Sequence, residues 1–181
     1  MLTIRPATPA DIPTMLRFIH ELATYEREPS AVIATEADLL RDGFSLAPDG
    51  TRLDSPIRFR TLIAEYSESR RELPEAPLTP AGFALYFTSY STWRGHHGIR
   101  LEDLYVTPSL RGKGIGRALL TRLAQIAIAE GCPRLEWDVL DWNAPAIAVY
   151  EKLGARVLTE WRIMRLAGDA LESLASQSPN S

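Results

Sequence analysis

Apolar residues recur every three or four positions near the start of the chain, which indicates a helix with one apolar stripe. Thr8 precedes the stripe as an N-cap, Pro9 takes the first helical position, and Asp11 follows three residues after the cap. These signals predict a helix over residues 8–28. Its stripe consists of Ile12, Met15, Leu16, Ile19, Leu22 and Ala23.

The same signals predict three further helices. One begins at Thr35 and is stopped by Gly43, the second occupies most of residues 111–131, and the third, over residues 143–154, begins at Asn143. The second of them starts at a group of glycines. Its apolar stripe consists of Leu119, Leu120, Leu123, Ile126 and Ala127.

Runs rich in β-branched and aromatic residues predict the strands. They lie at residues 2–7, 58–66, 82–90, 99–107, 134–141 and 160–166. The short spacing of the middle three favours an antiparallel meander. Residues 45–57 and 67–81 have the composition of loops, and a tail from Ser176 onward is expected to fray. The order of elements predicts a mixed sheet covered by helices.

The chain of 181 residues is 45% hydrophobic, which is enough for one domain with a substantial core. We expect this domain over residues 1–167, followed by a partly disordered tail over 168–181. The formal charge of −3 and the pI near 5.7 do not favour a nucleic-acid partner.

Cys132 is the only cysteine, so an intrachain disulfide is excluded and a reducing compartment is favoured. The first residues lack the apolar core of a signal peptide, and no apolar run approaches the roughly 20 residues that span a bilayer. We therefore expect a cytoplasmic protein without a membrane partner. His20, His96 and His97 have no metal-ligand company in the sequence, and no metal is expected.

The stretch RGKGIG, from Arg111 to Gly116, sets three glycines between cations at the start of a predicted helix. Free N–H groups at a helix N-terminus attract phosphate, and glycines let the backbone come close to it. The spacing differs from the dinucleotide fingerprint and from the nucleotide P-loop. A flexible turn is the alternative.

The stretch LEDLYVTPSLRGKGIGRALL resembles the acetyl-CoA signature of the GNAT acyltransferase superfamily, with Arg111, Gly114 and Gly116 at its defining positions. IRPATPADI, ELATYE, LLRDGF, GFALYF and WNAPAIAVYEKLGA extend the resemblance to the spermidine/spermine N-acetyltransferases, a group that includes thialysine acetyltransferases. The resemblance covers residues 2–166. It implies an α/β (α+β) GNAT fold, in which a bent, mixed and mostly antiparallel sheet is flanked by helices.

The resemblance also implies acetyl-CoA as the cosubstrate. The strand before the loop would hydrogen-bond the pantetheine arm, and the loop would hold the diphosphate. The implied coenzyme residues are Leu104, Tyr105, Val106, Arg111, Gly112, Lys113, Gly114, Ile115, Gly116, Arg117, Asn143 and Ala146.

Two residues match the catalytic positions of the family. A primary ammonium has a pKa of about 10.4, so some group must take its proton at neutral pH. Glu102 is implied as that base or as an amine ligand only; from the sequence alone it is an ordinary strand glutamate. Tyr150 is implied as the acid that protonates the departing thiolate, with a core aromatic as the alternative.

The resemblance implies an amine site lined by carboxylates and aromatic residues, some of them from a partner subunit of a homodimer. The implied residues are Tyr25, Glu26, Glu102, Glu136, Trp137, Asp138 and Glu160. Each carboxylate alone reads as a surface charge. Ser91 departs from the pattern, because the family has an aspartate there.

These observations predict an N-acetyltransferase that moves an acetyl group from acetyl-CoA to the primary amine of a small molecule by direct attack. The acceptor is expected to be a diamine, a polyamine or a lysine-like amino acid. Because Ser91 removes a carboxylate, a short diamine or a lysine analogue should serve at least as well as spermine. The alternatives are a protein-amine acetyltransferase and a non-catalytic acyl-CoA sensor.

Overall fold

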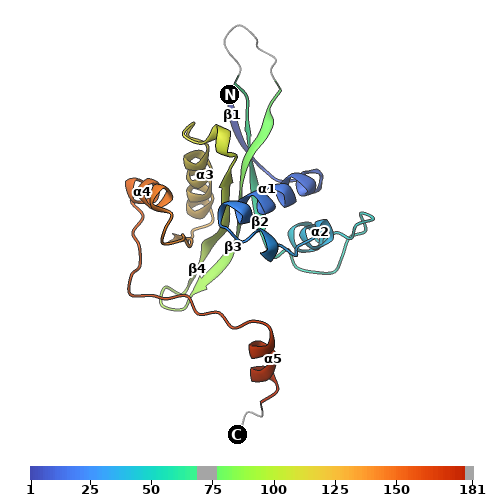
Figure 1. Cartoon of the computed structure of the whole chain (residues 1–181). Coiled ribbons are helices and arrows are strands. Elements are labelled where there is room, and N and C mark those ends of the chain that lie inside the picture. Colours follow the sequence, from blue (N-terminus) through green and yellow to red (C-terminus); the bar gives the residue numbers. More distant parts are fainter. Residues whose placement is uncertain (69–76, 178–181) are drawn as a thin grey trace. The chain divides into compact units, whose positions relative to one another are not determined.

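Five strands form one sheet in the computed structural model, which describes residues 1–68 and 77–177 (Figure 1). The strands follow one another across the sheet in chain order; β1 to β4 are antiparallel, and β5 runs parallel to β4. They are β1 (Leu2–Pro6), β2 (Arg60–Tyr66), β3 (Thr79–Ser91), β4 (His96–Val106) and β5 (Leu135–Glu136). The mixed, mostly antiparallel sheet predicted from the sequence is confirmed. Part of the predicted loop at 67–81 lies outside the described residues.

Two helices begin at the caps that the sequence predicts, whereas the helix predicted over residues 8–28 is shorter, because a 3-10 turn at Pro9–Asp11 precedes α1 and the helix ends at Tyr25. Thr8 and Asp11 form a capping box around a short 3-10 turn, and Thr35 does the same with Asp38. Asn143 accepts a hydrogen bond from the N–H of Ala146. The helices are α1 (Ile12–Tyr25), α2 (Glu36–Phe44), α3 (Ile115–Ala129), α4 (Ala144–Lys152) and α5 (Asp169–Ala175), with 3-10 turns at Pro9–Asp11, Pro29–Ala31 and Pro108–Leu110.

The core follows the alternation of the strands. Phe18 of α1 is fully buried and stacks on Phe83 of β3, with the ring of Tyr105 tilted beside it. The intervening strand positions, such as Leu62 and Leu101, are also buried, because α3 covers the opposite face with its own apolar stripe. The middle strands are therefore apolar on both faces, which explains their near-continuous hydrophobic sequence.

Two sequence predictions about strands are wrong. The strand expected at 134–141 shortens to two residues, which pair with Ile99 and Arg100 of β4. In the described part of the chain, residues 160–166 form no strand at all. Alternation shows that a segment can pair, but a strand also needs a neighbour whose backbone groups it can reach.

Two helix predictions also need correction. Gly43 does not stop α2, because the helix continues to Phe44 and ends at Ser45 in the left-handed conformation (φ 57°). Gly43 is required for packing instead: a Cβ there would lie 2.8 Å from the ring of Phe59. The predicted tail contains the short helix α5; its end at 178–181 lies outside the described residues.

The chain divides into two compact units, Met1–Asp138 and Val139–Ser181. The first contains the sheet with α1, α2 and α3, and the second contains α4, α5 and the segment between them. The single domain expected over residues 1–167 stays a prediction. No helix within the described residues combines the length and the apolar character needed to cross a bilayer.

Candidate active site

The loop before α3 exposes the N-terminus of that helix. Gly112 and Gly114 have φ of +79° and +82°, a conformation that side chains with a Cβ rarely adopt. Gly114 is the N-cap and has no side chain to bond the first turn, unlike Thr35 in α2. The N–H groups of the first turn are left for a ligand, and the helix dipole makes an anion the favoured one.

The cations of this loop are already engaged. Arg111 donates its Nε–H to the carbonyl of Val106 at 3.1 Å, and its guanidinium lies 4.5 Å from the ring centroid of Tyr25. Lys113 forms an ion pair with Glu68 and lies 5.2 Å from the ring centroid of Tyr66. These contacts hold the loop against β4 and β2, so anion binding here depends first on backbone N–H groups.

One edge of β4 is open beside this loop. On one side β4 pairs with β3 along its whole length, whereas β5 pairs with only Ile99 and Arg100 among the described residues. From Leu101 to Val106 the second edge therefore presents backbone N–H and C=O groups to an extended ligand. Leu104, Tyr105 and Val106 lie there; the Tyr105 side chain is buried in the core.

A β-bulge interrupts β4 at the start of this open edge. Leu85 of β3 pairs with Asp103 and Tyr86 pairs with Leu101, so Glu102 is the extra residue. Its side chain is exposed. A bulge bends the strand and redirects side chains, which is common next to active sites.

Three carboxylates gather around this bulge: Glu102, the half-buried Asp103, and Glu26 at the end of α1. Burial, followed by the charges of Glu102 and Glu26, raises the pKa of Asp103 to about 7. Burial also raises the pKa of Glu26. Among the described residues, no lysine or arginine forms an ion pair with any of the three. We call this group the bulge carboxylates.

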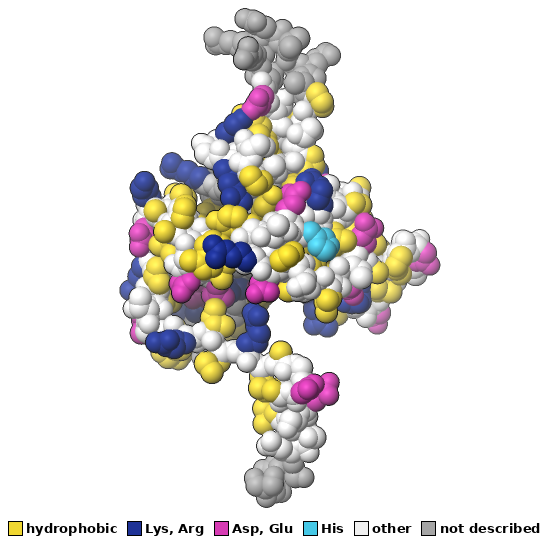
Figure 2. Space-filling view, in the orientation of Figure 1, with side chains coloured by type: hydrophobic (Ala, Val, Ile, Leu, Met, Phe, Trp, Pro, Cys, Tyr) yellow, Lys and Arg dark blue, Asp and Glu magenta, His cyan; other side chains and the backbone are white. Residues whose placement is uncertain are grey.

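The carboxylates in and just after β5 are neutralised. Glu136 of β5 forms an ion pair with Arg134 at 2.9 Å, and Asp138 forms one with Arg100 of β4. We call Glu136 and Asp138 the β5 carboxylates. On the face shown in Figure 2, acidic and basic side chains are interspersed. A cationic ligand is therefore attracted mainly by carboxylates that have no arginine or lysine partner nearby.

The second unit carries the remaining predicted residues. Asn143, Ala146 and Tyr150 are half-buried positions associated with α4, spaced so that they share one side of the helix. Tyr150 lies near the end of α4, and its backbone carbonyl accepts hydrogen bonds from the N–H groups of Leu153 and Ala155. Glu160 lies in a turn, and the residues from 161 to 167 that follow it have no regular secondary structure.

The chain matches the acetyltransferase (GNAT) family over residues 39–155. It is 40% identical over 177 residues to a thialysine N-epsilon-acetyltransferase of Bos taurus, with 96% of this chain and 97% of that protein covered. This chain is a GNAT acetyltransferase. It is also 34% identical over 197 residues to the L-ornithine N5-acetyltransferase NATA1 of Arabidopsis thaliana, with 94% of this chain and 86% of that protein covered.

The fold of this acetyltransferase is also found in a solved integron cassette protein from the mobile metagenome of V. cholerae. The two share a TM-score of 0.71 and 27% identity, over 97% of this chain and 98% of the other. The family and its named relatives confirm the predicted activity, an acetyl-CoA-dependent transfer to the amine of a small molecule.

The acetyltransferase brings only some of the predicted amine ligands together. Glu26 and Glu102 lie with Asp103, whereas Glu136 and Asp138 are each held by an arginine. Tyr25 lies against Arg111 of the loop. Trp137 stands between the two β5 carboxylates in the sequence.

Asp103 is not among the residues predicted from the sequence, because its neighbour Glu102 matched the family position. Aspartate is disfavoured in strands, so the pair Glu-Asp inside an apolar strand is the sequence feature that could have indicated Asp103.

Ser91 lies at the far end of β3, 8% exposed, and its Oγ accepts a hydrogen bond from the N–H of Arg94 at 3.3 Å. It is five residues from Tyr86 along the strand, roughly 17 Å from the bulge.

Proposed function

We propose that this acetyltransferase acts on the terminal primary amine of a lysine-like amino acid, and that the bulge carboxylates bind this amine. The main support is that the bulge carboxylates lie beside the open edge of β4 and form no ion pair with a described lysine or arginine. Pantetheine amides bound along Leu104–Val106 would bring the thioester to the bulge. The diphosphate would lie on the N–H groups of residues 112–117.

Asp103 is better suited than an ordinary carboxyl to take the proton of the amine. Transfer from an ammonium with a pKa of about 10.4 to a carboxyl with a pKa near 4.3 is uphill by about 6 units. With the pKa of Asp103 at about 7, the step is uphill by about 3 units. We therefore assign Asp103 as the base, acting directly or through water, and Glu102 and Glu26 as ligands of the ammonium. The neutral amine then attacks the thioester carbon, and the thiolate leaves.

Arg100 favours an amino acid over a diamine as the acceptor. Phe83 and Leu85 of β3 pack towards α1, and Phe87 shares their face, so its partner Arg100 lies on the same face as Asp103. Two strand positions separate them, roughly 7 Å. Five or six single bonds of about 1.5 Å, as between the carboxylate and terminal nitrogen of ornithine or lysine, span roughly 6–8 Å. An α-carboxylate can therefore reach Arg100 while the amine reaches Asp103.

The ion pair with Asp138 does not prevent this role of Arg100. A guanidinium has five N–H donors and can hold two carboxylates. Arg5 in this chain does so, bonding Asp11 and Glu65 at 2.8 Å each. We propose that the substrate carboxylate is the second partner of Arg100.

Tyr150 is our candidate for the acid that protonates the departing thiolate. The support is its place in the family motif and its half-buried position on α4, whose first turn is fixed by the Asn143 cap. Tyr150→Phe keeps the ring but deletes the acid, so turnover should fall by roughly 10²–10⁴-fold. Acetyl-CoA affinity should change little. Near-normal turnover in this variant, with chemistry rate-limiting, would show that another group is the acid.

We also propose a homodimer. In the second unit, large apolar side chains are exposed along an irregular segment and α5, which is uncommon for a surface without a partner. They are Val157, Leu158, Trp161, Ile163, Met164, Leu166, Leu171 and Leu174. Ile163→Asp with Met164→Asp should yield monomers in light scattering, whereas Ile33→Asp, at a position 89% exposed in the first unit, should not. A dimer in all variants would contradict this interface.

We place this enzyme in the cytoplasm, acting on small molecules and not on nucleic acid or membranes. The support is the single cysteine, the net charge of −3 and the interspersed surface charges. The expected result is that the enzyme binds neither DNA nor anionic vesicles.

Matched acceptors test the proposed function. Thiol release from acetyl-CoA is measured with lysine and ornithine, and with 1,5-diaminopentane and 1,4-diaminobutane, which are the same chains without the carboxylate. Spermine and a lysine peptide complete the set. We expect the amino acids to have the largest kcat/KM, and the diamines to equal or exceed spermine. A preference for the peptide would favour the protein-amine alternative, and no release with any acceptor would refute the function.

Arg100→Met separates the acceptor class from the activity itself. A hydrogen-bonded charge is worth about 1.5–3 kcal/mol, so kcat/KM for lysine should fall about 10- to 100-fold. The value for 1,5-diaminopentane should change little. Arg134→Met removes the neighbouring arginine that pairs with Glu136 and is the control. Equal losses with both acceptors would reject a carboxylate site at Arg100.

A further inference from the structure

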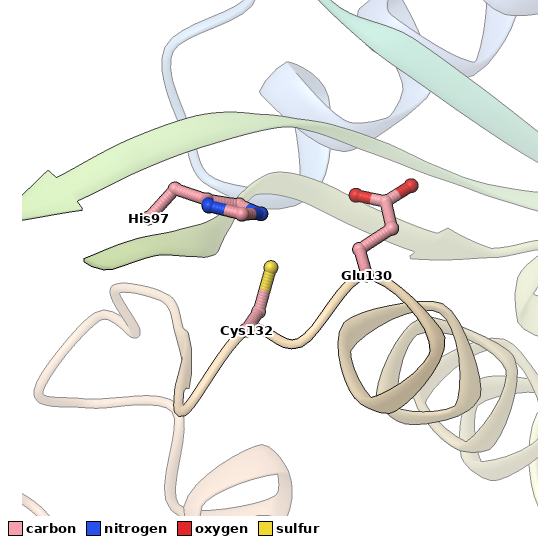
Figure 3. A group of neighbouring side chains, drawn as sticks. All are labelled: His97, Glu130 and Cys132. Atoms are coloured by element: carbon pink, nitrogen blue, oxygen red, sulfur yellow. The ribbon is translucent and has the colours of Figure 1, made fainter.

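Three metal-ligating side chains meet at a site away from the bulge. His97 is near the start of β4, Glu130 is the C-cap of α3, and Cys132 follows two residues later. One ligand atom from each lies within 4.8 Å of the others. Figure 3 shows the imidazole, carboxylate and thiol pointing towards a common space. His97 is five residues from Glu102, roughly 17 Å along the strand.

Regular structure fixes the three residues in place. Gly131, in the left-handed conformation (φ 71°), ends α3, and the N–H of Cys132 donates to the carbonyl of Ala127 at 2.7 Å. This turn buries Cys132 to 4% exposure. His97 is held by its pairing with Tyr90 of β3. The side of Glu130, whose side chain is 34% exposed, leaves an entry from solvent.

We propose that His97, Glu130 and Cys132 bind one Zn²⁺ ion, with water in the fourth position. Zinc accepts nitrogen, thiolate sulfur and carboxylate oxygen together at 2.0–2.3 Å, whereas calcium and magnesium require oxygen ligands. Tetrahedral bonds of those lengths place ligand atoms roughly 3.3–3.8 Å apart. The three atoms need to close by about 1 Å, which side-chain rotation alone can supply.

Arg60 supports this site although it already binds Glu130. It donates to the two carboxylate oxygens at 2.5 and 2.9 Å and lies 4.9 Å from the ring centroid of Tyr86. A carboxylate has about four lone-pair positions, so one oxygen can accept from Arg60 and also bind a metal. Carboxylates that bind metals are commonly oriented by such a hydrogen bond.

The charges of the site also suit a divalent cation. A carboxylate and a thiolate together neutralise Zn²⁺, and Arg60 stays as the outer partner. Zinc binding should therefore release the thiol proton and tighten with rising pH. The ion would clip the end of α3 to the start of β4.

Calorimetry of the chelator-treated full chain with Zn²⁺ tests the site. We expect one ion per chain and a rise in melting temperature with zinc. His97→Ala and Cys132→Ser should each weaken binding at least 100-fold, beyond the 10–100-fold typical of a group that only orients a ligand. His96→Ala is the matched control, because His96 stacks on His97 at 4.6 Å but is outside the cluster.

Cobalt gives a reading that does not depend on affinity. Co²⁺ bound to the wild-type chain should show thiolate-to-metal charge-transfer absorption. The Cys132→Ser variant should lack this absorption, although its melting temperature without metal should equal that of the wild type. The proposal is overturned if wild type binds no zinc, or if both ligand variants bind zinc as wild type does. Since the site is remote from the bulge, both variants should keep their acetyltransferase activity. The test of the zinc site is therefore independent of the test of the proposed function.

Discussion

The bulge carboxylates and the β5 carboxylates differ in their electrostatics. Glu136 and Asp138 each face an arginine, so their charge is already balanced in the folded chain. Asp103 faces Glu102 and Glu26, and burial together with these charges raises its pKa to about 7. The same residue types are therefore in two states: the β5 carboxylates form ion pairs with arginines, whereas no described lysine or arginine forms an ion pair with the bulge carboxylates.

This difference shows that residue type alone is a poor guide to an amine site. All five carboxylates except Asp103 matched family positions in the sequence. The ion pairs of Arg100 and Arg134 separate them into two groups. A cationic ligand gains most where the protein has left repulsion between carboxylates unrelieved, because binding then removes that repulsion as well.

The largest expected effect comes from Asp103→Asn. If Asp103 is the base, kcat/KM for the amine at pH 7 should fall by roughly 10²–10⁴-fold, the usual range for general base catalysis. Asp138→Asn should change kcat/KM for 1,5-diaminopentane, an acceptor without a carboxylate for Arg100, by less than about threefold, as expected of a partly exposed ion pair. Comparable losses in the two variants would remove the distinction between the groups.

The pH dependence sharpens the role of Asp103. In the free enzyme the carboxyl must be ionised to accept a proton, so kcat/KM should rise as the pH increases through about 7, where its pKa lies. Asp103→Asn should lack this limb and recover activity only at high pH, where the amine deprotonates unaided. An unchanged limb in the variant would assign that titration to another group.

Glu102→Gln should have a smaller effect, because it removes one of three charges around the ammonium. We expect KM for the amine to rise about tenfold, which corresponds to about 1.4 kcal/mol, while kcat falls less. Glu136→Gln is the matched change on the balanced side. If kcat instead falls by a larger factor than KM rises, Glu102 and not Asp103 would be the base.

Gly114→Val checks that these effects belong to the amine side. A β-branched residue in the left-handed conformation costs about 1–3 kcal/mol, so the loop should shift and acetyl-CoA affinity should fall by about tenfold or more. The apparent affinity for the amine should be kept. Unchanged coenzyme affinity by calorimetry would contradict a diphosphate site at this helix N-terminus.

The smallest effect concerns stability. Because the folded state holds the Asp103 proton more tightly than the unfolded chain, the stabilisation is complete below about pH 4, falls progressively as the pH rises, and is fully lost above about pH 7. Asp103→Asn should therefore melt a few degrees above wild type at pH 8, and close to it below about pH 4. Asp138→Asn should show no such gain. A lower melting point for Asp103→Asn at pH 8 would mean that its charge is compensated.

The sequence by itself determined the local signals of this protein. Thr35 and Asn143 predicted where two helices begin, Thr8 predicted the cap of the turn before α1, and the glycines of RGKGIG predicted the start of α3. A cap acts on backbone groups two or three residues away, and a left-handed residue acts on its own backbone. Such effects need no distant partner, so they can be read from the order of residues.

Only the tertiary structure decided which residues meet. The bulge at Glu102 arises from a register shift between β3 and β4. The length of β5 depends on how many residues of β4 it can pair with. Arg100 is 38 residues from Asp138, and His97 is 33 residues before Glu130. Pairing over such separations, and with it the pKa of Asp103, depends on how the strands and helices pack, because electrostatic energy depends on distance in space.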